Sequence, residues 1–394
     1  RKQLAERLGR ESTRLVPDSG EPKLGFLMRL AEVLEWSIED VAHHIWVEDG
    51  ESSATANGHA NGATDFSTLE QAAKQADREG RAEDAVHLAR RARAQASSSE
   101  ERAVAGIREA AGWEAMGRYM QAMAVLQECL QLGGVSRDRR LMLQVNLANT
   151  YYSLWHLTEA TGLVQGPLMQ FESMPPESRL HRVLHAFALY IRGNCLRRQM
   201  AVDGDDLDTH ARGAKHDLRR AHELHLQLAE DFDDAFYRGI ARTCLGGALE
   251  AETALGERTP TETLERYEAA LEELVDSDPA PTGSLLESYG WWCVFGCSVT
   301  LRHLDHEQDV QKRMAVFTNK ADEIAEQLGN WSIRERVFAM QYARQQRLAD
   351  WMGTEAQWIL DSDDIRIMAG TMGRFPSFRS KAWRMLDAAQ IISN

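Results

Sequence analysis

The sequence is poor in cysteine, in proline and in long hydrophobic runs, and these scarcities exclude several classes of protein. No run approaches the roughly 18 apolar residues that span a bilayer, and no charged-then-apolar segment opens the chain, so neither a membrane protein nor a secretory leader is expected. The five cysteines are odd in number and mostly far apart, which favours a reducing compartment over a disulfide framework. We therefore expect a cytoplasmic protein.

The net charge of -15 excludes a large nucleic-acid-binding face. Affinity for phosphates needs clustered Lys and Arg side chains, which an acidic chain does not offer over most of its surface. Residues 1–30 nevertheless hold seven basic against four acidic side chains. Any contact with DNA is expected to be local and to involve this segment.

Signatures of catalysis and of metal binding are also missing. The sequence has no glycine-rich nucleotide loop, no H-E-x-x-H and no paired C-x-x-C, so we expect no enzyme, no catalytic residues and no cofactor. His181 with His185, and His222 with His225, share helix faces as zinc ligands do, but no third ligand is tied to either pair by a known spacing. Ordinary polar positions on helices are the preferred interpretation, and no metal site is predicted.

The length and the patterning indicate two all-helical domains. A chain of 394 residues exceeds one ordinary hydrophobic core, which stops growing at roughly 250–300 residues. The segment 48–66 lacks hydrophobic periodicity and is rich in Gly, Ala, Ser and Asn, as flexible linkers are. After it, helical patterns continue without sustained period-2 alternation. The sequence therefore predicts an all-α protein with a small domain at 1–47 and a large domain at 67–394.

Small residues recur at fixed offsets in the large domain. Three positions, separated by 12 and then 7 residues, occur three times, and the sets start 37 and 38 residues apart. The sets are Ala73, Ala85 and Ala92; Ala110, Ala122 and Cys129; and Ala148, Ala160 and Pro167. Antiparallel helices approach closely only where small side chains face each other, and each pair must bury its remaining apolar face on the next pair. Stacked helix pairs are therefore predicted.

Glycines fall between the paired helices, at Gly80 and Gly117, where a glycine ends one helix and lets the chain reverse. Together with Tyr119 and Tyr151, these positions resemble tetratricopeptide repeats over roughly residues 67–171. The resemblance implies an α-solenoid of about six to seven helix pairs with an atypical C-terminal cap. In residues 374–384 basic and aromatic side chains interleave as they do in anion sites, but a cap anchored by aromatics is the preferred interpretation.

The later helix pairs diverge from the pattern of the first three. We predict them at Leu189–Met200 with Ala214–Glu230, Ala235–Leu255 with Thr263–Val275, and Leu285–Leu304 with Val310–Leu328, followed by a helix at Ile333–Trp351. In this repeat type the first helix of each pair lines the concave surface, where Asn and Arg can hold an extended peptide. The predicted effector-binding residues are Val145, Asn149, Tyr152, Arg192, Asn194, Arg238 and Arg242. For the last four, a core or exterior position is the alternative.

Short apolar helices separated by tight turns make up the small N-terminal domain. The pattern of Leu4, Ala5 and Gly9 resembles an XRE-type helix-turn-helix head, in which the second helix enters the major groove of DNA. The family's first helix has no counterpart, so a shortened head is expected, and Pro17 requires a short recognition helix. The resemblance implies DNA contact by Lys2, Gln3, Arg10, Ser12, Thr13 and Arg14. Arg14 would pair bidentately with guanine.

A helix-turn-helix head joined to a tetratricopeptide array resembles the peptide-sensing transcriptional regulators. The resemblance implies a homodimer that binds double-stranded DNA through its heads and a peptide or protein effector through its solenoid. An effector with unequal affinity for two solenoid curvatures or dimer arrangements would change how the heads meet DNA. The alternative is an adaptor whose array gathers protein partners and whose head is vestigial.

Overall fold

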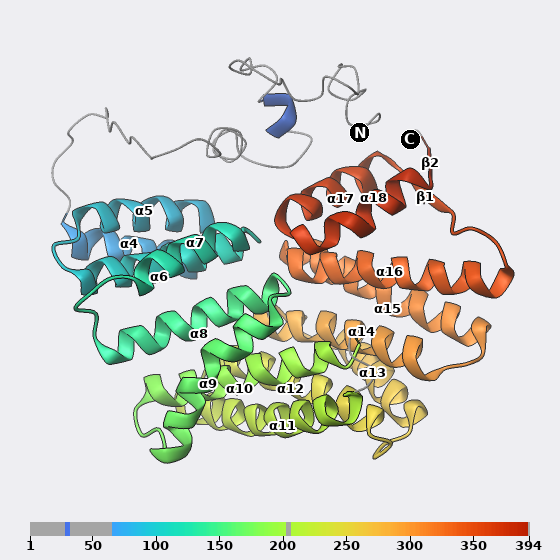
Figure 1. The fold of residues 1–394 in the computed structure, drawn as a ribbon, viewed down its shortest axis with the longest axis horizontal. Coiled ribbons are helices and arrows are strands. Elements are labelled where there is room, and N and C mark those ends of the chain that lie inside the picture. The colour runs from blue at the N-terminus through green and yellow to red at the C-terminus, as the bar shows by residue number, and fades with distance from the viewer. Residues whose placement is uncertain (1–27, 32–64, 202–205, 393–394) are drawn as a thin grey trace. The chain divides into compact units, whose positions relative to one another are not determined.

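The computed structural model describes residues 28–31, 65–201 and 206–392, with only the backbone of Ile391. The chain divides into two compact units: Thr64–Ala356, which contains the solenoid, and a unit that includes Gln357–Asn394. Helices make up nearly all of the described residues (Figure 1), so the prediction of an all-α solenoid is confirmed. The predicted head at 1–47 and linker at 48–66 lie almost entirely outside the described residues.

Three helix pairs open the solenoid unit, as the recurring small residues predicted. They are α4 (Phe66–Arg78) with α5 (Ala82–Gln95), α6 (Ser99–Ala115) with α7 (Tyr119–Leu130), and α8 (Arg137–Ser153) with α9 (Leu157–Ser173). Asp65, Ser98 and Ser136 cap the first helix of each pair, since each side chain accepts a hydrogen bond from the backbone N–H three residues later. All nine repeated small positions are buried.

The remaining helices of the solenoid unit correspond to the divergent later pairs and the final helix that the sequence predicts. They are α10 (Arg179–Gln199), α11 (Leu207–Phe232), α12 (Ala235–Ala254), α13 (Pro260–Val275), α14 (Gly283–His303), α15 (Glu307–Leu328) and α16 (Trp331–Met352). Helix α10 begins well before the predicted Leu189, because Ser178 caps it by accepting a hydrogen bond of 3.2 Å from the His181 N–H. Its first turns already carry apolar residues at helical spacing, Leu180, Val183, Leu184 and Phe187, so the sequence analysis placed the start too late.

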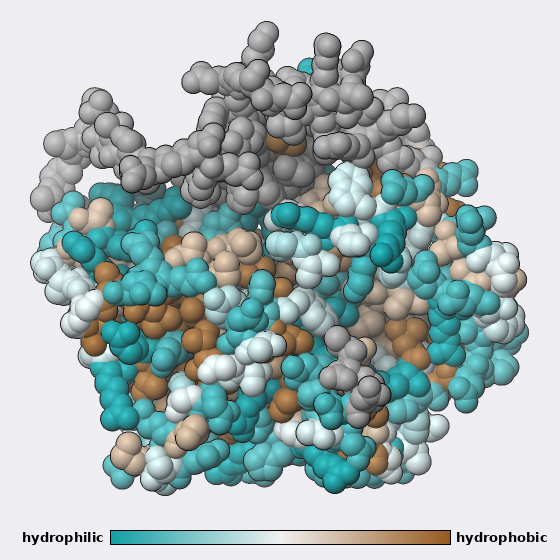
Figure 2. All heavy atoms as spheres, viewed as in Figure 1, coloured by the Kyte–Doolittle hydropathy of each residue, from teal (hydrophilic) through white to brown (hydrophobic). Residues whose placement is uncertain are grey.

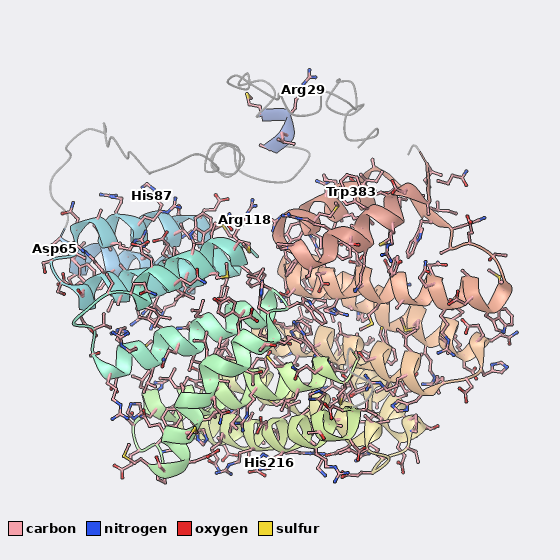
Figure 3. The ribbon with its side chains drawn as sticks, viewed as in Figure 1. Arg29, Asp65, His87, Arg118, His216 and Trp383 are labelled. Carbon is pink, nitrogen blue, oxygen red and sulfur yellow. The ribbon has the colours of Figure 1, made fainter. Side chains whose placement is uncertain are left out.

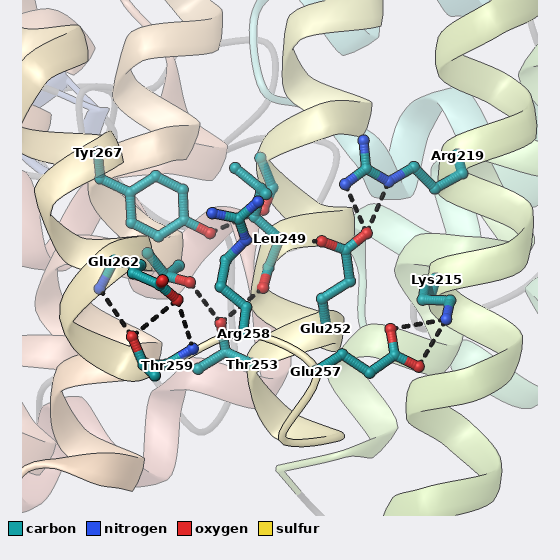
Figure 4. A network of polar contacts seen from close by, with 12 residues as sticks. Lys215, Arg219, Leu249, Glu252, Thr253, Glu257, Arg258, Thr259, Glu262 and Tyr267 are labelled. Carbon is teal, nitrogen blue, oxygen red and sulfur yellow. Dashed lines mark hydrogen bonds and ion pairs between the residues drawn. The ribbon is translucent and has the colours of Figure 1, made fainter.

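Surface ion pairs join neighbouring helices of the solenoid unit (Figure 4). From α11, Lys215 reaches Glu257 at 2.6 Å and Arg219 reaches Glu252 at 2.7 Å, and Thr259 opens α13 in a capping box. Hydrophilic residues cover most of the face that Figure 2 shows. Exposed pairs of this kind contribute only about 0–1 kcal/mol each, so the stability of the array rests on its core.

Within the described residues, no helix has both the length and the apolar content needed to cross a bilayer.

The largest core lies among α12, α13, α14 and α15. Trp292 and Tyr267 are fully buried there with ring centroids 5.4 Å apart. The Trp292 indole N–H donates to the carbonyl of Arg242 at 2.7 Å, and the Tyr267 hydroxyl donates to the carbonyl of Gly246 at 2.8 Å. A β-carbon at Gly246 would overlap the Trp292 ring, so glycine allows α12 and α14 to approach closely. All five cysteines are buried and free, as small hydrophobic side chains.

The second unit contains a short parallel sheet that the sequence did not predict. Strand β1 (Trp358–Leu360) pairs with β2 (Ala389–Ile391), and between them in the chain lie α17 (Ser362–Arg374), the 3₁₀-helix η1 (Pro376–Phe378) and α18 (Arg379–Asp387). Phe375 and Phe378 are almost completely buried. Two of the aromatic residues that interleave with basic ones in this stretch therefore anchor the packing of the unit, whereas Trp383 is exposed.

Candidate functional site

The solenoid unit closes on itself where two of its turns meet α16 (Figure 1). In the α6–α7 turn, Gly117 packs on Trp331, and the Tyr119 hydroxyl lies 2.7 Å from the Ser332 hydroxyl, 213 positions away in the sequence. Arg118, labelled in Figure 3, is buried in the same turn. We call the contacts of 117–119 and of residue 155 with residues 331–336 the seam. It joins the second and third helix pairs to the last helix of the unit.

Trp155 occupies, in the α8–α9 turn, the position that Gly80 and Gly117 occupy in the first two pairs. All three have positive φ angles of 68°, 72° and 69° respectively. After each of them, the next backbone N–H donates to the carbonyl five residues earlier at 2.7–2.9 Å, which is the same helix-ending motif three times. For a residue that has a β-carbon, this left-handed backbone conformation is less stable than a right-handed one by roughly 1–2 kcal/mol. Trp155 is therefore strained at a position that favours glycine, and such strain concentrates at functional sites.

Two arginines lie against the Trp155 ring. The guanidinium carbon of Arg198, on α10, lies 4.3 Å from the ring centroid, and that of Arg336, on α16, lies 4.6 Å from it. The indole N–H points to the Glu335 carboxylate at 3.4 Å. Arg198 also donates to the carbonyl of Tyr152 at 2.6 Å and covers that ring at 3.8 Å. We call Trp155, Arg198, Arg336 and Glu335 the Trp155 cluster, in which cation–π contacts from both arginines hold one indole.

Positive charge exceeds negative charge around the Trp155 cluster. Arg197 pairs with Glu250 at 2.9 Å, and both side chains are nearly inaccessible. Arg336 lies 3.6 Å from Glu335. Among the residues that the structure describes, no carboxylate oxygen lies within 4.0 Å of Arg198. Burial first, and then repulsion from Arg198 and Arg197, lower the pKa of Arg336.

Two carboxyl groups with raised pKa values also lie near the seam. Burial raises the pKa of Glu114 to about 7, although the Thr150 hydroxyl donates a hydrogen bond to this carboxylate. Burial likewise raises the pKa of Glu287, which accepts a hydrogen bond of 3.0 Å from Asn330. Both carboxyl groups are close enough to Tyr119 that their charges, after burial, raise the pKa of its hydroxyl. The interior thus holds titratable groups on both sides of the seam.

Glu114→Gln is expected to flatten the pH dependence of stability between pH 4.5 and about 7. Because the folded pKa of Glu114 is raised, the folded chain keeps a proton that the unfolded chain releases, so stability falls as pH rises through this window. At about 1.4 kcal/mol for each pKa unit, the loss is about 3 kcal/mol. Urea unfolding at about pH 5 and about pH 7.5 should show a smaller decrease for the variant than for the wild type. Parallel decreases would contradict the raised pKa.

Three of the predicted effector-binding residues lie near the Trp155 cluster. The Arg198 guanidinium lies over the Tyr152 ring. Asn149 is on the same helix as Tyr152, and its side-chain amide nitrogen lies 3.5 Å from the Glu114 carboxylate. Asn194 is almost completely buried and accepts a hydrogen bond of 3.1 Å from Arg197. Contact of these three side chains with an effector stays a prediction.

The other four predicted effector-binding residues have different surroundings. Val145 is fully buried in the core that α8, α9 and α10 share, so its side chain packs against other helices rather than on an open surface. Arg192, Arg238 and Arg242 each lie within 4.0 Å of a carboxylate on another segment of the solenoid unit. The predicted DNA-binding residues Lys2, Gln3, Arg10, Ser12, Thr13 and Arg14 lie outside the described residues.

The sequence analysis missed Trp155, Arg198 and Arg336. For Trp155 a signal was available, since it follows Gly117 by the same 38 positions that separate Ala110 from Ala148. A tryptophan where the repeat places glycine is an exception that the alignment of the first three pairs reveals. Arg198 belongs to a divergent pair and Arg336 to the helix that follows the pairs, and neither had such a signal.

The histidines and other metal-binding side chains form no metal centre in the described part of the chain. No group of three or more His, Cys, Asp or Glu residues is arranged there to hold an ion. His181 instead lies 2.9 Å from Asp138. His225 is buried, which lowers its pKa to about 4, and its ring lies 2.8 Å from the carbonyl of Ala221.

Two open grooves of the solenoid unit contain no residue of the seam. One, of about 340 Å³, is lined by residues of α8 and α9 that include Arg137 and Gln170. The other, of about 670 Å³, is lined by residues 277–285 together with Phe236 and Tyr289. Neither groove brings together buried charged groups of the kind found in the Trp155 cluster.

No known protein family matches the chain, and no curated protein matches it either. Among solved structures, the chain is similar to a Rap protein in complex with Competence and Sporulation Factor, at 11% sequence identity and a TM-score of 0.45. The similarity covers 93% of this chain and 89% of that one. At so low a TM-score and identity, it says nothing about what this chain binds.

Proposed function

We propose that the chain is a regulator without catalytic activity, whose solenoid binds a peptide or protein effector and whose N-terminal head binds double-stranded DNA. The observation that carries the binding role is the Trp155 cluster, where a strained turn residue meets two buried arginines. A fold keeps strain and buried charge where a function requires them more often than elsewhere. The predicted residues Asn149, Tyr152 and Asn194 lie near this cluster and supply further polar and aromatic groups.

The seam is the element through which an effector would act. Its contacts join two early helix pairs to α16, so a ligand that prefers the closed seam would favour one curvature of the solenoid. In a homodimer, a change of curvature would alter the spacing of the two heads relative to their DNA half-sites. The size of this coupling equals the difference in the effector's affinity for the two states.

Arg14→Ala is expected to abolish sequence-specific DNA binding by the whole chain. Arg14 is the predicted bidentate partner of guanine, a contact that contributes roughly 1–3 kcal/mol of discrimination. The wild type should select a site from a library of duplex fragments at two salt concentrations in the presence of competitor DNA. The variant should retain only weak, salt-labile binding.

Arg29→Ala is the matched control, since it removes a positive charge from the same basic segment at an exposed position. It should leave the selected sequence unchanged. If the wild-type chain selects no sequence, the DNA-binding role is wrong, and an adaptor that gathers protein partners on its solenoid takes its place.

A further inference from the structure

Buried N–H groups without acceptors mark the Trp155 cluster. The Nε of Arg198 and the Nη1 of Arg336 are both buried and have no hydrogen-bond partner among the described residues. Arg198 as a whole is only 5% exposed. Buried polar groups in folded proteins are nearly always hydrogen-bonded, and exceptions call for a physical explanation. The Nη1 of Arg336 lies 3.6 Å from the Glu335 carboxylate, which is an ion-pair distance rather than a hydrogen bond. Both donors belong to guanidinium groups that contact the same indole ring, and each can accept a further hydrogen-bond partner.

The balance of charge points the same way. Arg197 and Glu250 satisfy each other as a buried pair. Among the described residues, the only carboxylate within 4.0 Å of either Arg198 or Arg336 is that of Glu335, which also accepts the Trp155 indole N–H. Glu114 and Glu287 also lie near the seam, but burial raises the pKa of both and so disfavours their charged forms. A buried positive charge that lacks a counterion is energetically unfavourable. One additional negative charge beside these arginines would therefore stabilise them.

We propose that the Trp155 cluster binds an oxyanion, a carboxylate or a phosphate group, which accepts hydrogen bonds from Arg198 and Arg336 beside the Trp155 ring. Guanidinium groups match both kinds of oxyanion because they offer several N–H donors in a rigid fork. The anion supplies acceptors for the two N–H groups that lack them and the negative charge that the cluster lacks. This proposal rests on the proposed effector-binding role of the Trp155 cluster and names the chemical group that the cluster would recognise; it does not depend on DNA binding by the head.

The strained backbone of Trp155 fits the proposed site. Glycine would remove the strain, but it would also remove the aromatic surface on which both guanidinium groups rest. Arg198 lies on α10 and Arg336 on α16. An anion that binds both arginines therefore links helices that are distant in the sequence, and its binding and the closure of the seam depend on the same side chains.

Isothermal titration calorimetry of the full chain tests the site. Sodium phosphate and sodium acetate are titrated separately into the protein in a chloride buffer of constant ionic strength, which removes general screening effects. We expect saturable binding of one ion per chain for at least one of the two probes. Binding of acetate identifies a site for carboxylates, and binding of phosphate alone identifies a site for phosphates.

Variants then locate the bound ion. Arg198→Gln and Arg336→Gln should each weaken binding at least about tenfold, because each removes a charged donor. Arg220→Gln is the control: this arginine is exposed, lies 2.9 Å from Glu223 and should leave the affinity unchanged. If circular dichroism shows that a glutamine variant is unfolded, an Arg→Lys variant at the same position replaces it. Lysine keeps the positive charge but lacks the planar set of guanidinium N–H donors, so it should still weaken binding. Absence of saturable binding of either ion, or unchanged affinity in folded variants, overturns the proposal.

Discussion

Arg197→Met is expected to destabilise the folded chain by about 3–5 kcal/mol, because it leaves the Glu250 carboxylate buried without its partner. In the wild type the Arg197 guanidinium reaches Glu250 at 2.9 Å and Asn194 at 3.1 Å, and it covers the Phe295 ring at 4.5 Å. The pair thus connects α10, α12 and α14 from the inside of the solenoid. Methionine keeps much of the volume and removes the charge. Urea unfolding at neutral pH measures the loss.

The double variant Arg197→Met/Glu250→Gln should recover most of that loss, since it removes the uncompensated charge together with its former partner. Arg220→Met is the matched surface control: Arg220 pairs with Glu223 at 2.9 Å, but both side chains are about half exposed. It should cost less than about 1 kcal/mol. Equal losses for Arg197→Met and Arg220→Met would show that the interior pair is not shielded from water as described here.

Gly117→Ala is expected to destabilise the chain by about 2–4 kcal/mol. Its φ angle of 69° costs alanine roughly 1–2 kcal/mol. In addition, a β-carbon at this position would lie 2.8 Å from the Trp331 side chain, so the seam must shift to admit the methyl group. Overpacking of this kind adds typically 1–3 kcal/mol.

Gly80→Ala separates the two effects. Gly80 has the same role in the first helix pair and a φ angle of 72°, but its β-carbon would meet nothing within 4 Å. This variant should lose only the backbone contribution, roughly 1–2 kcal/mol. The difference between the two variants, measured by urea unfolding, reports the contact across the seam. A difference of zero would contradict that contact.

The first three helix pairs could be predicted from the sequence because the evidence for them is local. Ala73, Ala110 and Ala148 stand 37 and 38 residues apart, and small residues there have a single physical role, which is to let paired helices approach. The later pairs have longer helices whose starts depend on capping rather than on an apolar stripe. Ser178 caps α10 eleven residues before the predicted start at Leu189, and this cap fixes the beginning of the helix.

The seam could not be predicted, because it depends on the curvature of the whole solenoid. Tyr119 and Ser332 meet across 213 positions, and no pattern in the sequence relates them. Small rotations between successive pairs add up along an array, so contacts between its distant turns follow from all of the intervening helices together. Trp155 was the part of the site that the repeat spacing alone could reveal, as an exception to glycine.

A disulfide across the seam tests the central claim most directly. In Gly117→Cys/Trp331→Cys, the two β-carbons would start 2.8 Å apart, within about 1 Å of the roughly 3.8 Å that a disulfide prefers. All five native cysteines are buried and free, so the wild type oxidised in parallel is the control for any link among them. Mild oxidation of the folded full chain should form an intramolecular link that speeds migration on a non-reducing gel, whereas Gly80→Cys/Trp331→Cys should form none. Two free, reactive thiols in the first variant after oxidation would contradict a solenoid that closes at this seam.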